Sequence, residues 1–229
     1  GAFRTREATP LTHAGPEAFF AARAQTASVP FYDDDPTSSI AVREAQGSAR
    51  TLYGRAIVTN GKSDGSVGGR NLEYPTMALL GLLPCLVADT CERAFVVGWG
   101  TGVTAGELAA LESTREVQVA EISRGVLRAA PLFAHANLGV SSSPKLRLVR
   151  SDAYRALLRS EGQWDVIVSE PSNPWVAGVE MLFSREFLAA ARDRLRPGGV
   201  YVQWFHAYET DTETLSLILR TYATVFDGV

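Results

Sequence analysis

From Cys91 onward, short apolar runs alternate with amphipathic stretches along the chain. The apolar runs predict five strands, at 94–98, 117–122, 146–149, 165–169 and 200–204. After each of them comes a stretch with helical spacing, near 104–112, 124–137, 153–160, 184–195 and 212–225. Strands that alternate with helices form right-handed βαβ units. The pattern therefore predicts an α/β fold, with helices on both faces of a parallel sheet.

The first part of the chain follows a different pattern. Residues 1–35 form a poorly specified lead-in, and "YDDDPTSS" at 32–39 is typical of a solvated turn. Apolar and polar positions alternate over 39–60, which predicts two or three antiparallel strands, and the glycine-rich segment 62–71 predicts a mobile loop over a site. We therefore expect a lead-in (1–35), a small β unit with its glycine-rich loop (36–72) and an α/β domain (73–229).

Composition narrows the class of protein. The 229 residues are 46% hydrophobic, enough for one sizeable core, and a net charge of -3 without a basic run argues against nucleic acid binding. The apolar run at 77–88 contains a proline and is too short to span a bilayer, so we expect a core helix there. Cys85 and Cys91 match no common zinc spacing; we expect reduced packing thiols, a reducing compartment such as the cytoplasm, and no metal site.

The first strand of the α/β part runs into the loop "GWGTG". Gly98, Gly100 and Gly102 allow the backbone to turn sharply and approach a ligand. A dinucleotide fingerprint would require a further glycine where Val103 stands, which disfavours an NAD-dependent oxidoreductase. The glycine spacing instead favours an S-adenosyl nucleoside.

Acidic residues stand at the ends of the next three strands. Glu121 could accept hydrogen bonds from both ribose hydroxyls, or could stabilise a helix N-terminus. Asp152 could reach an adenine amino group, or cap the helix that begins at Ala153. Glu170 opens the proline-flanked loop "SEPSNPW", where an ion pair is the structural alternative. Because ligands bind at the carboxyl ends of such strands, the three side chains fit one adenosine.

Taken together, "VVGWGTGVTAGEL", "VAEISRGVLRAAPLF", "RSDAYRALL" and the stretch from "DVIVSEPSNPW" to "YVQWF" resemble the spermidine synthase family of polyamine aminopropyltransferases. The resemblance runs from about 60 to 205. It implies an N-terminal β unit before a Rossmann-like, methyltransferase-type sheet, and aminopropyl transfer from decarboxylated S-adenosylmethionine to putrescine. The family's final β-hairpin has no counterpart before Val229. Similarity to bacterial domains fused to transporter-like segments implies a membrane-embedded partner or tether at the inner membrane face; a homodimer is a further expectation.

The resemblance also implies roles for individual residues. Glu170 and Asn173 would be catalytic, and Asp64 and Trp175 would contact the amine. The residues expected to bind the nucleoside cosubstrate are Gly98, Gly100, Thr101, Gly102, Glu121, Ile122, Asp152, Ala153 and Glu170.

This sequence departs from the family on the amine side. The family has a second aspartate where Asn173 stands, and an amide can neither attract an ammonium nor take its proton. The family's Tyr-His/Gln-Glu stretch falls on Thr76, Met77 and Ala78, and its loop glutamine falls on Asp64. The sequence therefore predicts a retained nucleoside pocket and an altered amine pocket.

Three functions stay open on these residues. The first is an aminopropyltransferase or close relative with altered acceptor choice. The second is an S-adenosylmethionine-dependent methyltransferase, and the third is a catalytically silent nucleoside-binding regulatory domain. His206 could be a base at the last strand or a packed side chain, and Trp175 could wall the acceptor pocket or anchor its loop.

Overall fold

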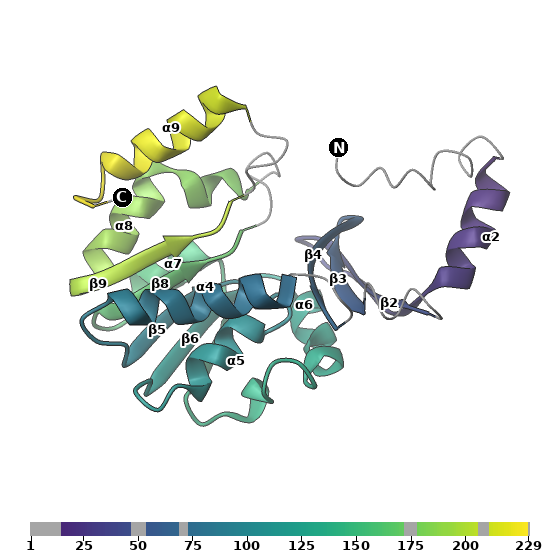
Figure 1. The fold of residues 1–229 in the computed structure, drawn as a ribbon, viewed down its shortest axis with the longest axis horizontal. Coiled ribbons are helices and arrows are strands. Elements are labelled where there is room, and N and C mark those ends of the chain that lie inside the picture. Colours follow the sequence, from purple (N-terminus) through teal and green to yellow (C-terminus); the bar gives the residue numbers. More distant parts are fainter. Residues whose placement is uncertain (1–14, 47–53, 69–72, 172–177, 206–210, 229) are drawn as a thin grey trace.

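The computed structural model describes residues 15–46, 54–68, 73–171, 178–205 and 211–228. Two sheets organise this part of the chain (Figure 1). The first is antiparallel, with strands in the order β1 (Ala27–Asp34), β2 (Ser39–Ala45), β3 (Arg55–Thr59) and β4 (Lys62–Val67). It follows helix α2 (Pro16–Thr26), which stands apart from the rest of the molecule in Figure 1.

The second sheet is parallel and has five strands. Their order is β7 (Leu146–Arg150), β6 (Glu116–Glu121), β5 (Arg93–Val97), β8 (Trp164–Ser169) and β9 (Leu195–Gln203). The chain moves from β5 to one edge through β6 and β7, then returns to the other side of β5 through β8 and β9. The strand order thus reverses between β5 and β8, and a cleft at the carboxyl ends of the strands is expected at such a point.

Alternate residues of the buried strands pack against helices on opposite faces of the parallel sheet. One face, which includes Val96 and Val166, contacts α4 (Glu73–Val87), α5 (Val103–Ala110) and α6 (Arg124–Ala129). The other face, which includes Phe95 and Ile167, contacts α7 (Ala153–Arg159) and α8 (Arg185–Arg194). Helix α9 (Thr212–Ala223) packs beside α8. Short 3-10 turns occur at Ala130–Phe133, Val140–Ser142 and Glu180–Phe183.

The predicted fold class is confirmed, but the N-terminal region differs from expectation. Residues predicted as a lead-in form β1, and the start of the predicted mobile loop forms β4, so the antiparallel sheet has four strands. β4 lies against the parallel domain at Gly65, where a Cβ would lie 3.4 Å from the Thr101 methyl carbon and 3.5 Å from the Met77 sulfur, in ordinary van der Waals contact. Residues 69–72 of the predicted loop lie outside the described residues.

The cysteine prediction was wrong. Cys85, in the last turn of α4, and Cys91, just before β5, are joined by a disulfide with a Cα–Cα distance of 5.2 Å. The two residues looked like packing thiols because they lie in apolar sequence, but the short link from α4 to β5 brings them together. Within the described ranges, no helix is long and apolar enough to cross a membrane.

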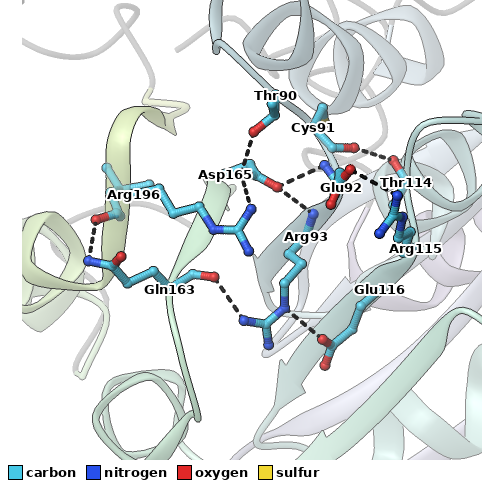
Figure 2. A network of polar contacts seen from close by, with 11 residues as sticks. Thr90, Cys91, Glu92, Arg93, Thr114, Arg115, Glu116, Gln163, Asp165 and Arg196 are labelled. Atoms are coloured by element: carbon cyan, nitrogen blue, oxygen red, sulfur yellow. Dashed lines mark hydrogen bonds and ion pairs between the residues drawn. The ribbon is translucent and has the colours of Figure 1, made fainter.

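A polar network secures the amino ends of the parallel strands (Figure 2). The buried Asp165 carboxylate accepts hydrogen bonds from the Thr90 hydroxyl at 2.7 Å and from the backbone N–H groups of Glu92 and Arg93 at 2.8 and 2.7 Å. Arg196 pairs with it at 3.0 Å. Burial opposes ionisation, but these partners hold the pKa of Asp165 below its usual value. The negative charge of Asp165 thus has a structural role, because it joins the amino ends of the strands, opposite the predicted site.

Candidate active site

A cavity of about 1000 Å³ opens at the carboxyl ends of β5, β6 and β8 and is walled on one side by the antiparallel sheet. The structure brings together nine of the predicted site residues in its lining: Asp64, Gly98, Gly100, Thr101, Glu121, Ile122, Asp152, Ala153 and Glu170. Gly102 is not among the lining residues. Asn173 and Trp175, like His206, lie outside the described residues.

The glycine loop after β5 serves two purposes. Gly98, Gly100 and Gly102 all have positive φ, at 83°, 53° and 79°. Gly98 and Gly100 line the cavity, whereas a Cβ on Gly102 would lie 2.8 Å from the Asn137 amide nitrogen and 2.9 Å from the Trp99 ring. Gly102 therefore permits close packing at the start of α5, a tertiary requirement that glycine spacing alone does not reveal.

Glu121 ends β6 as a buried carboxylate whose position is held from two sides. Its Oε2 accepts a hydrogen bond from the Trp99 N–H at 2.8 Å, and its Oε1 accepts one from the Ser123 N–H at 2.7 Å. Burial raises the pKa of Glu121, although these backbone donors oppose the shift. A carboxylate has about four lone-pair sites, so the group can accept further hydrogen bonds from a ligand's hydroxyls.

Asp152 follows β7 and stands at the start of helix α7. Its side chain accepts a hydrogen bond from the Arg155 N–H at 2.9 Å and so caps helix α7. The same residue lines the cavity, together with Ala153 in the first turn of that helix.

Glu170 follows β8 and, like Glu121, is a carboxyl of the cavity wall whose pKa is raised. Burial, aided by the negative charges of Glu73 and Asp64, raises its pKa to about 7, against a hydrogen bond from the Thr104 hydroxyl at 3.4 Å. Asp64 pairs with Lys62 at 3.4 Å. Three carboxylates from β4, α4 and the end of β8 thus share one part of the cavity.

Among the lining residues that sequence reasoning missed, two sets stand out. One is Glu73, which opens α4, and the other is the turn between β1 and β2, where Thr37 and Ser38 reach the cavity. The charged stretch at 32–39 looked like a solvated turn because a local pattern does not show what packs against it. The run of aspartates before Pro36 was the available signal, because Asp side chains order a turn by accepting hydrogen bonds from nearby backbone N–H groups.

Some of the departures from the family pattern fall on residues that line this cavity. Thr76 and Met77 line it. The Met77 carbonyl accepts a hydrogen bond from Thr104 at 3.0 Å, and the Met77 sulfur lies 3.1 Å from the Thr101 hydroxyl. In this part of the wall the sequence supplies a hydroxyl and a thioether, so the polar groups that could hold an amine come from elsewhere. Among the described residues, no three His, Cys, Asp or Glu side chains are arranged so that they could hold a metal ion.

The strand order and the cavity at the carboxyl ends of the strands define a Rossmann-like α/β protein, and comparisons with known proteins identify its family. A family model described as a spermine/spermidine synthase domain matches residues 76–229. Polyamine aminopropyltransferase 2 of Hyperthermus butylicus is 28% identical over 176 residues, covering 76% of this chain and 56% of that protein. Polyamine aminopropyltransferase 1 of Pseudomonas aeruginosa is 31% identical over 131 residues, covering 57% and 46%.

Solved structures show the same fold. A spermidine synthase crystallised with the transition-state analogue AdoDATO matches with a TM-score of 0.75 at 20% identity, over 87% of this chain and 65% of that one. The Thermotoga maritima spermidine synthase matches with a TM-score of 0.71 at 19% identity, over 86% and 63%. The chain therefore belongs to the spermine/spermidine synthase family. It spans about half the length of the curated relatives it matches.

Proposed function

We propose that this chain is an aminopropyltransferase-like transferase that binds decarboxylated S-adenosylmethionine and transfers its aminopropyl group to an amine. The proposal rests on the lining of the cavity. Glu121 and Asp152 line it at the ends of the neighbouring strands β6 and β7, and Glu170 lines it after β8, where the strand order reverses. In this reading Glu121 accepts hydrogen bonds from the ribose, Asp152 faces the adenine and Glu170 lies beside the aminopropyl chain.

The charge of the cavity favours the decarboxylated donor over S-adenosylmethionine itself. The decarboxylated cosubstrate ends in an ammonium, whereas S-adenosylmethionine carries a carboxylate as well. Asp64, Glu73 and Glu170 line the cavity, and Lys62, the basic residue of its lining, is paired with Asp64. A donor carboxylate near these groups would be repelled, so the methyltransferase alternative is disfavoured.

The acceptor must lose a proton before its nitrogen attacks the carbon beside the sulfonium. The C–N bond then forms as the C–S bond breaks. The electron pair of the C–S bond stays on sulfur, which gives methylthioadenosine. The Asn173 amide cannot take the amine proton, so we expect low or absent putrescine turnover at neutral pH. Asn173→Asp should raise putrescine turnover by about tenfold or more, because general-base help is typically worth 10²- to 10⁴-fold.

The experiment is a calorimetric titration with decarboxylated S-adenosylmethionine, S-adenosylmethionine and methylthioadenosine, followed by an assay of amine-dependent methylthioadenosine release. Binding of the decarboxylated donor that is tighter by about tenfold or more, with amine-dependent release, would support the proposal. Tighter S-adenosylmethionine binding would instead favour a methyltransferase. Nucleoside binding with no turnover across a panel of amines, even by Asn173→Asp, would favour the silent regulatory domain, which the loss of the second aspartate also supports.

The expected cytoplasmic location, the membrane-embedded partner or tether and the homodimer stay predictions. Light scattering on the purified chain measures the mass in solution and so tests the homodimer. A full-length gene product that lacks any hydrophobic segment would contradict the fused-segment prediction.

A further inference from the structure

We infer that Asp35, in the turn between β1 and β2, is a positioning residue that connects the antiparallel sheet to the ribose-binding end of the cavity. The inference rests on the proposed function, because it acts through Glu121. The side chain of Asp35 uses its two oxygens for separate purposes, one within its own turn and one across the interface between the sheets.

The first oxygen organises the turn. Oδ1 accepts hydrogen bonds from the Thr37 N–H at 2.7 Å and the Ser38 N–H at 3.1 Å, and from the Thr37 hydroxyl. The Asp35 N–H closes the turn by donating to the Ser38 carbonyl at 3.0 Å. Because Thr37 and Ser38 both line the cavity, this oxygen fixes the part of the wall that the turn between β1 and β2 supplies.

The second oxygen reaches the parallel domain. Oδ2 accepts hydrogen bonds from the Ser123 hydroxyl at 2.6 Å and from the Gly125 N–H at 2.9 Å, at the start of α6. Ser123 is only 3% exposed, and its own N–H donates to the Glu121 carboxylate at 2.7 Å. A continuous path of hydrogen bonds therefore runs from Asp35 through Ser123 to Glu121.

The interface is closely packed around the Asp35 carboxylate. A Cβ on Gly125 would lie 2.8 Å from the Ile40 side chain and 3.3 Å from Asp35 Oδ2, so the two units are in close contact there. Burial works against the charge of Asp35, but the hydrogen bonds from Ser123 and Thr37 lower its pKa well below the usual value. Each oxygen of Asp35 accepts hydrogen bonds from more than one donor. An asparagine would replace one oxygen by an NH₂ group, which cannot accept these bonds.

Asp33, near the end of β1, provides a matched control. Its Oδ1 pairs with Arg128 at 2.9 Å and with Arg124 at 3.8 Å. Asp33 therefore also holds β1 against α6, but these partners give it no path to Glu121. A residue that only docks the sheet should behave like Asp33, and a positioning residue should not.

The experiment is a double-mutant cycle on the affinity of the full chain for methylthioadenosine. Asp35→Asn should weaken binding by about tenfold, the range expected for a lost charge-assisted hydrogen bond. In the Glu121→Ala background the same change should cost less than about twofold, because the residue through which it acts is gone. Asp33→Asn should change the affinity by less than about twofold in either background, whatever it does to the thermal midpoint.

Equal losses from Asp35→Asn in both backgrounds, or an equal loss from Asp33→Asn, would overturn the inference and leave the proposed function standing. No methylthioadenosine binding by the unmodified chain would overturn the proposed function and this inference with it. If Asp35→Asn does not fold, Ser123→Ala replaces it in the cycle, with Ser123→Thr as the variant that retains the hydroxyl and should restore the affinity.

Discussion

Replacing Glu170 by glutamine should stabilise the protein at alkaline pH but not at acid pH. The folded protein raises the pKa of this carboxyl from its usual 4.5 to about 7, through burial and the nearby charges of Glu73 and Asp64. At 1.36 kcal/mol for each pH unit between those values, ionising the group costs the folded state about 3 kcal/mol above pH 7. The folded state retains the proton that the unfolded state releases, so this cost sets in as the pH rises from about 4.5 to 7.

Glutamine keeps the shape of the side chain and has no charge to desolvate. The thermal midpoint of Glu170→Gln should therefore exceed that of the unmodified protein by roughly 6–12 °C at pH 8.5, with a much smaller difference at pH 4.5. Thermal unfolding followed by circular dichroism across this range measures both, and the exposed Glu186→Gln serves as the control. A difference of the same size at both pH values would refute the reasoning. Glu170 also gains its negative charge as the pH rises through about 7, so the cationic decarboxylated S-adenosylmethionine should bind more tightly above that pH.

Three further predictions concern the nucleoside pocket and the packing around it. Glu121→Ala should weaken methylthioadenosine binding by about 2–4 kcal/mol in a titration while the circular dichroism spectrum is unchanged; unaltered affinity would contradict the ribose assignment. Gly102→Ala should lower the thermal midpoint more than Gly100→Ala, since both have positive φ but only the first would place a Cβ under 3 Å from neighbouring side chains. Without reductant, Cys85 and Cys91 should resist maleimide labelling, and Cys85→Ser should reduce the free energy of unfolding by about 2 kcal/mol for so short a loop; full labelling of the native protein would argue against the disulfide.

Much of the site was accessible from the sequence because it depends on local patterns. Continuous apolar runs followed by helical spacing predicted the parallel sheet, and parallel strands bring their carboxyl ends to one edge. Glu121, Asp152 and Glu170 each stand at or just after the end of such a run, so their meeting at one cavity followed from their positions along the chain. Gly98 and Gly100 were predictable for the same reason.

Other features depend on which segments meet, and the tertiary structure alone decided them. The sequence around Asp35 predicts a solvated turn. In the structure this turn packs against the start of α6, where Asp35 contacts Ser123, 88 residues further along the chain. Gly102 proved to be a packing position, because Trp99 and Asn137 close over it.

What the sequence by itself determined about this protein is its fold class, its glycine loop and the acidic residues at its strand ends. Strand and helix periodicity and the geometry of a parallel sheet are properties of short segments, so they can be read before the chain is folded. The tertiary structure decided the raised pKa of Glu170, the pairing of Cys85 with Cys91 and the part played by the antiparallel sheet in the cavity wall. Each of these depends on how deeply a group is buried or on which elements come into contact. Burial and contact arise only when the chain folds, so a pattern along the sequence does not contain them.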